Sequence, residues 1–301
     1  MRKGLTASVV VAAICLAACD ATKALNTYFQ DVGLNRLAMV RDDIQPGALI
    51  VSDKKNSLYA NSMFDYTVPE AGGSIPLTAT VEDRTADFNA ALSKYSSERV
   101  MQPSAALGFI GSILPVDISG DLKFSAAVQI DLQNVKGQRL SIKSIEDYLA
   151  SSSSRPLRDK VLALRASNSG YSAYVVYEIL RSNKMAIKTT DGSDIDASLK
   201  VGEIKPVSKA ELGLVYKKTK TSELELAGDR YYVFAVRVGA LVPGGGMAGV
   251  RFDQLNFKVP GGTIKAVSDD SYSALVTAGE KAMVLQRGPE AAMTLEKLGL
   301  R

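Results

Sequence analysis

The sequence predicts an α+β fold in which the helices are segregated from a mainly antiparallel β-sheet. From Leu122 to Leu132 apolar residues alternate with polar ones, which is the pattern of a long strand with one buried face. Further along the chain several apolar segments follow one another, separated by the turn dipeptides Asp191-Gly192 and Gly228-Asp229. Such dipeptides favour tight hairpins, and strands joined by hairpins pair antiparallel. The helical patterns lie in other parts of the chain, as expected for an α+β domain.

Residues 1–18 have the three parts of a bacterial signal peptide. Arg2 and Lys3 supply a positive start, and Leu5 to Leu16 is an uncharged, mostly apolar run that is too short to span a bilayer as a stable helix. The run ends in Leu-Ala-Ala-Cys19, which resembles the lipobox of bacterial lipoproteins. This resemblance implies cleavage before Cys19 and acylation of its thiol, by palmitate or a similar chain. An ordinary secretory signal peptide, cut after an Ala-x-Ala-like site, is the alternative.

The residue after the cysteine carries the next prediction. Asp20 resembles the aspartate that retains enterobacterial lipoproteins at the inner membrane. The resemblance implies a protein of the bacterial cell envelope, lipid-anchored on the periplasmic side, with the inner membrane favoured. The polar spacer from Asp20 to Lys23 reaches only about 14 Å even when extended, so we expect the folded body to lie against the membrane.

The mature chain is predicted to form one α+β domain over residues 22–265 and a helical tail over residues 269–301. Leu25, Phe29 and Val32 have helical spacing and predict an amphipathic helix from Thr22 to Val40. Pro46 and Gly47 then turn the chain into a short buried strand, and residues 56–75 are rich in turn formers and predict a loop.

Two helices are expected after the alternating strand. Ser144 and Asp147 resemble a capping box for the first helix. Ser154 and Pro156 open the second, whose apolar face carries leucine and valine at helical spacing. The strand segments that follow are Tyr171–Arg181, Met185–Thr190, Glu211–Lys218, Glu223–Ala227, Tyr231–Val242 and Val250–Val259.

The composition excludes several classes of enzyme. The chain has no histidine, and its two cysteines lie near the N-terminus. The lipobox resemblance implies that one of them leaves with the signal peptide and that Cys19 is acylated. Ser-His, Cys-His and His-metal sites are therefore excluded, and we expect no enzyme, no metal and no cofactor. The net charge is +4, and the predicted cleavage would remove Arg2 and Lys3 from it. The small net charge and the absence of a run of basic residues in the sequence argue against binding of nucleic acid.

Three weaker motifs have simpler interpretations. Ser52 and Lys55 have the S-x-x-K spacing of penicillin-recognising enzymes, but the accompanying motifs are missing. The loop from Gly244 to Gly249 matches G-x-G-x-x-G, yet a strand pattern rather than a helix follows it, which predicts a hairpin loop. The aspartates near residue 194 lack the spacing of a calcium loop and predict a solvated turn (Asp191, Asp194, Asp196).

One region is similar to a known family. The segment "AYVVYEILRSNKMAI" (Ala173 to Ile187) and the segment "YKKTKTSELELAGDRYYVFAVRV" (Tyr216 to Val238) resemble the second β-hairpin region of the pore-forming gasdermins. The resemblance implies a soluble form whose strands extend into membrane hairpins. It also implies that a helical C-terminal tail, here residues 269–301, restrains that change.

Two functions therefore stand as hypotheses. The leading one is a non-catalytic envelope lipoprotein that binds a partner protein, a lipid or an envelope polymer at the membrane surface. The alternative is a gasdermin-like pore former. Glu223, Glu225 and Arg237 lie on the candidate membrane strands, and a charge that faces lipid costs about 2–4 kcal/mol, so these strands insert only if their charged face lines water. On this ground the sequence alone favours the first hypothesis and predicts no pore.

Overall fold

The structure of the chain is a computed structural model. It describes residues 34–53, 57–68, 80–89, 100, 102–103, 106, 122–167, 170–197, 214–244, 249–254, 285–286 and 289–300. The strands are β1 (Asn35–Arg41), β2 (Ala48–Ser52), β3 (Ser57–Ser62), β4 (Val81–Asp83), β5 (Leu122–Phe124), β6 (Val128–Gln133), β7 (Lys136–Leu140), β8 (Ser172–Thr189), β9 (Ile195–Ala197), β10 (Leu214–Lys220), β11 (Glu223–Pro243), β12 (Val250–Gln254) and β13 (Leu285–Gln286). The helical elements are η1 (Met63–Tyr66), α4 (Ile142–Ala150), η2 (Ser152–Ser154), α5 (Arg155–Ala166) and α7 (Pro289–Lys297).

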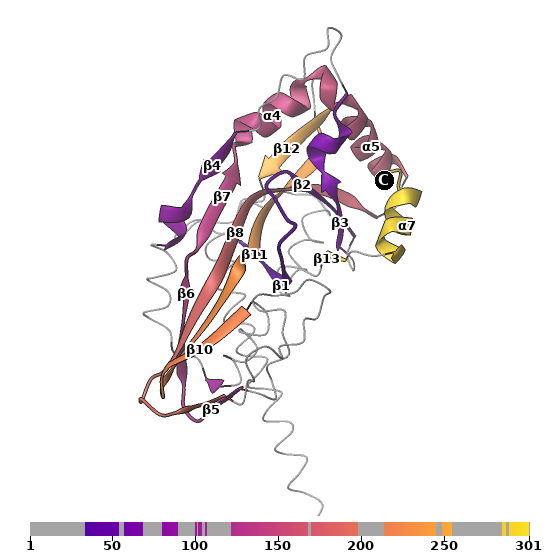
Figure 1. The fold of residues 1–301 in the computed structure, drawn as a ribbon. Helices are drawn as coiled ribbons and strands as arrows, with labels where there is room; N and C mark the ends of the chain where they lie inside the picture. Colours follow the sequence, from indigo (N-terminus) through magenta and orange to yellow (C-terminus); the bar gives the residue numbers. More distant parts are fainter. Residues whose placement is uncertain are drawn as a thin grey trace, which may run out of the picture.

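Strands β8 and β11 form the centre of a large sheet. They pair antiparallel over almost their whole length; β2, β6 and β7 flank β8, and β1, β10 and β12 flank β11. The sheet continues through β3 to β13, which pairs with β3 in parallel, whereas the other described pairings are antiparallel. Figure 1 shows α4, α5 and α7 gathered at one end, while β6, β8, β10 and β11 extend to the opposite end. The predicted α+β class on a mainly antiparallel sheet is confirmed.

The two central strands are longer than the sequence predicts. β8 runs unbroken through the expected gap near Ser182, and β11 runs through Gly228-Asp229, where a hairpin turn was expected. The prediction of a hairpin at Gly228-Asp229 is therefore wrong. Between the pairs Ala227↔Lys184 and Tyr232↔Ser182, β11 contains extra residues and forms a bulge. A bulge accommodates turn-forming residues inside a strand because the neighbouring strand holds the chain on both sides of it.

The alternating strand of residues 122–132 is divided, but its phase is correct. Ser125 to Ala127 separate β5, which pairs with β9, from β6, which pairs with β8. Phe124, Val128 and Ile130 are buried, and Gln129 between them is half-buried.

The N-terminal part of the body differs from expectation. Residues 35–41 form a strand on β11, although helix was predicted to Val40; the residues that carried the helical pattern lie outside the described part. Residues 57–66 form β3 and η1 rather than loop. β1 pairs with the distant strand β11, and β3 pairs with its neighbour in sequence, β2, and with β13, so strand pairing outweighs the local pattern in both cases.

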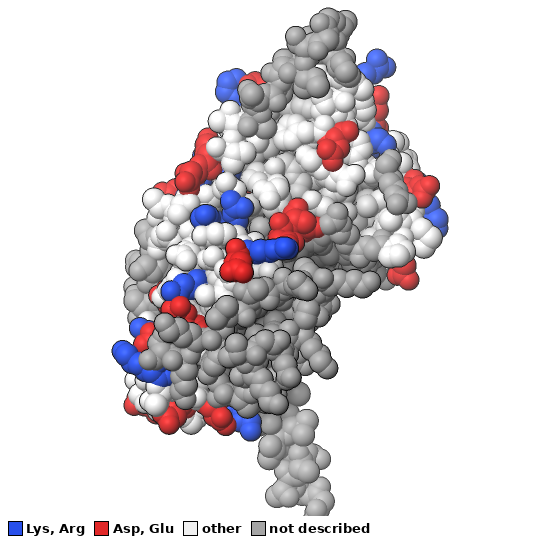
Figure 2. All heavy atoms as spheres, viewed as in Figure 1, with Lys and Arg blue, Asp and Glu red and all other residues white. Residues whose placement is uncertain are grey.

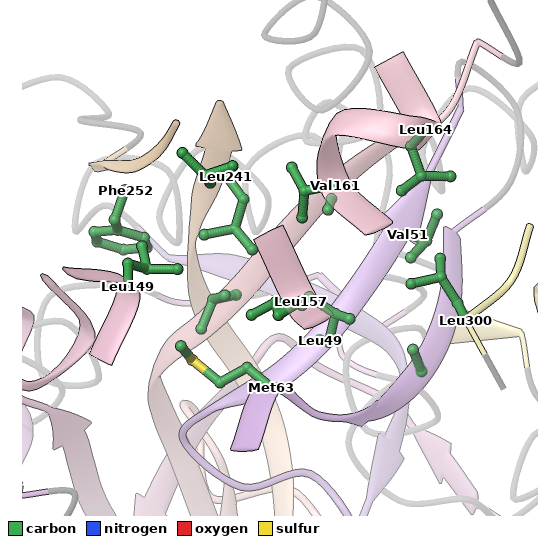
Figure 3. Close-up of a cluster of buried hydrophobic side chains, with 14 of the residues drawn as sticks. Leu49, Val51, Met63, Leu149, Leu157, Val161, Leu164, Leu241, Phe252 and Leu300 are labelled. Atoms are coloured by element: carbon green, nitrogen blue, oxygen red, sulfur yellow. The ribbon is translucent and has the colours of Figure 1, made fainter. Parts of the chain in front are cut away.

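Helices α4 and α5 cover one face of the sheet. α4 begins at Ile142, so the predicted capping box is wrong: Ser144 lies inside the helix and its hydroxyl accepts a bond from the Thr80 amide. α5 begins after Ser154 with Pro156 in its first turn, as predicted. Figure 3 shows its face of Leu157, Val161 and Leu164 packed over Leu49 and Val51 of β2, together with other residues of a single buried cluster.

The opposite face of the same strands is also buried. Tyr174, Val176 and Ile179 of β8 and Val236 and Val238 of β11 form a second cluster with residues of β1 and β2. Both faces of the sheet are therefore buried at the helical end. None of the described helices is long and apolar enough to cross a membrane.

Candidate functional site

The feature that distinguishes this sheet is the part of it beyond the β11 bulge. We call this part the ribbon: β6, the end of β8 (Lys184–Thr189), the start of β11 (Glu223–Ala227), and β10. Its four strands lie side by side in the order β6-β8-β11-β10 and extend away from the helices (Figure 1).

Across β6, β8 and β11 one face of the ribbon is apolar, whereas the fourth strand, β10, places Lys218 opposite Leu224 in register. Two neighbouring rows of paired residues, which we call rungs, place six apolar side chains side by side across β6, β8 and β11. The rungs are Ile130↔Ile187↔Leu224 and Leu132↔Met185↔Leu226. Leu132 is half-buried, and the other five are at most 5% exposed.

The other face of the ribbon carries lysines and glutamates that form salt bridges between strands. Lys184 Nζ lies 2.9 Å from a carboxylate oxygen of Glu225, and Lys188 Nζ lies 3.2 Å from Glu223. Lys220 lies 3.6 Å from the same Glu223. The hydrogen bond from Lys188 is the main cause that lowers the pKa of Glu223. Pairs as exposed as these add little stability, but they leave this face close to neutral. Figure 2 shows positive and negative side chains interspersed at this end of the molecule.

Three turns meet at the tip of the ribbon. The Ala127 carbonyl accepts bonds from the backbone amide and the hydroxyl of Thr190, at 3.0 and 3.1 Å. The Thr189 amide donates to the Ser222 carbonyl, and the Ile195 amide donates to the Thr221 carbonyl. Polar groups of the turns thus tie the tip together.

A row of alternating charges crosses the sheet between the ribbon and the helical end. Glu82 of β4, Arg139 of β7, Glu178 of β8 and Arg237 of β11 are neighbours in register. Arg139 Nε donates to Glu82 at 2.9 Å, and Arg237 Nη1 donates to Glu178, whose side chain is fully buried. Burial raises the pKa of Glu178, although Arg237 and two further arginines lower it. Burial also raises the pKa of Tyr177, to about 12.

The C-terminal segment is docked on the edge of the body. β13 pairs with β3, and α7 buries Ala291 and Leu295 in the cluster beneath α5. Leu300 is 1% exposed and lies beside Val51 in Figure 3. The Tyr66 hydroxyl donates to the Leu300 carbonyl at 2.6 Å. The helix predicted near the C-terminus is confirmed for α7, and the rest of the predicted tail lies outside the described residues.

The structure describes only some of the residues that the sequence singled out. Cys19 and Asp20 lie outside the described part of the chain, as does Lys55 of the S-x-x-K motif. The Gly244 amide bonds to the Gly249 carbonyl where β11 turns into β12, which confirms the hairpin.

The aspartate-rich turn also forms as a solvated turn. Hydrogen bonds from the Ser193 side chain and then from its amide lower the pKa of Asp191. Among the described residues no group of acidic, cysteine or histidine side chains is arranged to hold a metal.

Sequence reasoning found the strands of the ribbon but missed its charge pairs. The signal was present, because Lys184 and Lys188 share one parity on β8 while Glu223 and Glu225 share one on β11. Which lysine faces which glutamate depends on the register of two strands about 40 residues apart, and the wrongly predicted hairpin at Gly228 obscured that register.

Comparison with known proteins identifies the family. The sequence profile described as the Bacterial Gasdermin Family matches residues 39–244, which is more than half of the chain. The chain belongs to the bacterial gasdermins. A solved structure, that of a bacterial gasdermin from Bradyrhizobium tropiciagri, is similar with a TM-score of 0.40 and 13% sequence identity, over 75% of this chain and 88% of that one. No curated protein matches the sequence.

The family membership changes the balance between the two hypotheses. The matched region includes the whole gasdermin-like stretch of residues 173–238 and extends to residue 39, so the likeness is not confined to two amphipathic strands. For this gasdermin the pore-forming alternative is therefore better supported than the leading hypothesis of a partner-binding lipoprotein.

Proposed function

We propose that this gasdermin is a membrane pore former whose ribbon inserts into a lipid bilayer. The observation that carries the proposal is the two-sided ribbon, with six aliphatic side chains on one face and paired charges on the other. In a bilayer the apolar face would contact acyl chains, and the charged face would line a water-filled passage.

The glutamates of β11 that argued against membrane insertion are compatible with it once the pairing of the strands is known. Glu223 and Glu225 lie on the same face as Lys184 and Lys188, so inserting the ribbon exposes none of these four charges to lipid. Each would cost about 2–4 kcal/mol if it faced lipid near the midplane. Arg237 lies outside the ribbon and pairs with Glu178.

Insertion requires the ribbon to lengthen. A membrane strand needs about 9–11 residues, and β6 has 6 and β10 has 7, whereas β8 and β11 have 18 and 21. The polar turns at the tip would have to open, because their residues lie where the strands must extend.

The docked C-terminal segment is the proposed restraint. It closes the β3 edge through β13 and completes the cluster beneath α5 with Leu295 and Leu300. Removing the segment would expose the β3 edge and the cluster beneath α5. This exposure favours rearrangement of the sheet.

A lipid anchor at Cys19 would place the ribbon beside its target. We propose that acylated Cys19 holds the chain on the periplasmic side of a bacterial membrane and that Asp20 favours the inner membrane, as the lipobox resemblance implies. Two or more acyl chains make such attachment stable. The bilayer itself is then the main partner, and neither a cofactor nor a catalytic residue is required.

Leakage from vesicles tests the proposal. Purified mature chain with a protease site at Gly261-Gly262 should release dye from liposomes after cutting, and much less before. Leu132→Lys puts a charge on the apolar face and should abolish release, whereas Gln133→Lys, on the neighbouring residue and the other face, should not. Circular dichroism melts would confirm that both variants fold. No release by the cut wild-type chain, or equal release by both variants, would return the partner-binding lipoprotein to first place.

The anchor is tested separately in cells. Cells supplied with an alkyne fatty acid should label the wild-type protein, because acylation adds the probe at Cys19. Cys19→Ala should lose the label and move the protein into the soluble periplasmic fraction. A Cys19→Ala protein that stays on the membrane would refute the anchor but not the pore.

A further inference from the structure

Two cations and a tyrosine lie together just beyond the ribbon. Lys136 Nζ is 4.1 Å from the centre of the Tyr231 ring, and the Arg181 guanidinium carbon is 5.7 Å from it. Lys136 of β7 and Arg181 of β8 are opposite each other in register. Like charges that face each other across two strands destabilise a sheet, so this pair calls for an anion.

No carboxylate in the described part of the chain forms a salt bridge with either cation, although most other cations of the sheet have one. Hydrogen bonds from Thr85 are the main cause that lowers the pKa of Asp83, and the charge of Lys136 contributes least. The buried Nε of Arg181 also has no hydrogen-bond partner among the described residues. The cluster therefore has spare positive charge.

The cluster lies on the apolar side of the sheet, next to the apolar face of the ribbon. Leu132 pairs with Met185, and four residues further along both strands Lys136 pairs with Arg181. β8 runs unbroken from Arg181 to Met185, so this even spacing places both residues, and the partners opposite them, on one face, about 13 Å apart along the strand. Going from the tip toward the helical end, this face therefore presents the apolar rungs first and then the two cations with Tyr231.

The chain on either side of β8 is irregular between these rungs. Asn134 has a positive φ of 51°, Ser182 bonds to the Gln133 carbonyl through its hydroxyl, and β11 has its bulge at Gly228–Tyr231. The Asn183 side chain donates to the Gly228 carbonyl across the bulge, at 3.0 Å. The regular ladder of the ribbon thus stops at the level of the cluster.

We infer that Tyr231, Lys136 and Arg181 form an interfacial anchor that binds anionic lipid headgroups and stops insertion of the ribbon at that level. Tyrosine rings concentrate at membrane–water interfaces, and lysine and arginine extend their charged ends to the headgroups from just outside an apolar band. The occupant is a lipid phosphate rather than a free anion, because the cluster continues the face that would contact acyl chains. This inference rests on the proposed function.

Depth-dependent quenching tests the level of the anchor. The sequence contains no tryptophan, so the variants Tyr231→Trp and Leu132→Trp each carry a single fluorescent indole. In cut protein on vesicles containing phosphatidylglycerol, the indole of Tyr231→Trp should be quenched best by lipids labelled near the headgroup. The indole of Leu132→Trp should be quenched best by lipids labelled deep in the acyl chain.

The outcomes of this experiment separate the anchor from the pore. Deep quenching of the Leu132→Trp variant, with the Tyr231→Trp variant unquenched or equally deep, would overturn the anchor and leave the pore intact. If neither variant is quenched, both proposals fall.

Lipid dependence tests the chemistry of the anchor. A basic residue near an anionic membrane contributes roughly 1 kcal/mol, about fivefold in affinity, so Lys136→Gln with Arg181→Gln should weaken binding to phosphatidylglycerol vesicles well over tenfold. Lys143→Gln with Arg155→Gln removes the same charge from exposed positions on α4 and α5 and should change binding far less. Inorganic phosphate should not compete. Equal loss in both double variants, or competition by phosphate, would overturn the inference.

Discussion

Replacing Arg237 with methionine should destabilise the protein by about 3–5 kcal/mol, because it leaves the buried carboxylate of Glu178 without its cross-strand partner. Chemical denaturation at neutral pH would measure the loss. Lys143→Gln removes a cation from an exposed pair on α4 and should cost far less. The double variant Glu178→Met with Arg237→Met should recover much of the stability, since apolar side chains of similar size can replace a buried pair. A single variant as stable as the wild type would show that the pair does not hold β8 and β11 together.

The same variant should respond to pH in a predictable direction. Burial raises the pKa of Glu178 above its ordinary value of 4.5, and Arg237 opposes that rise. Without the arginine the folded-state pKa rises further, so the folded protein holds this proton to a higher pH than the unfolded chain does. That contribution to stability is fully present below pH 4.5 and is lost as pH rises through the folded-state pKa. The loss of unfolding free energy caused by Arg237→Met should therefore be smaller at about pH 4 than at about pH 7. An equal loss at the two pH values would contradict this explanation.

Leu295→Asp should release the C-terminal segment and produce leakage without any cut. Leu295 is 8% exposed and packs in the cluster beneath α5, and an unpaired carboxylate there costs several kcal/mol, which undocking of α7 relieves. Liposome dye release and limited proteolysis of the C-terminus would both report it. Met293 on the same helix is 54% exposed, so Met293→Asp should leave the segment docked and the liposomes intact.

The outcomes of this comparison separate two roles for α7. Release by Leu295→Asp alone identifies the docked helix as the restraint on the ribbon. Faster proteolysis without release would mean that α7 stabilises the body but does not restrain it. Release by both variants would mean that the added charge, rather than undocking, causes leakage.

Local patterns determined those features of the molecule that depend on neighbours in the chain. The alternation of residues 122–132 predicted which side chains are buried, although it missed the break at Ser125–Ala127. Ser154 with Pro156 predicted the start of α5, and its apolar spacing predicted the face that packs on β2. The likeness of residues 173–238 to the gasdermins pointed to the family, and the order of residues before Cys19 predicts a lipid anchor that no described residue reports on.

Tertiary structure alone decided how the strands continue and which charges meet. Gly228-Asp229 has the composition of a turn, yet it is a bulge, because hydrogen bonds from β8 on either side hold β11 extended. The edge strand β1 forms where part of a helix was expected, because β11 offers it an unpaired edge. The charge pairs of the ribbon and the row from Glu82 to Arg237 join strands that are far apart in sequence. Such contacts form only when the register of the whole sheet is set, and no local pattern contains that register.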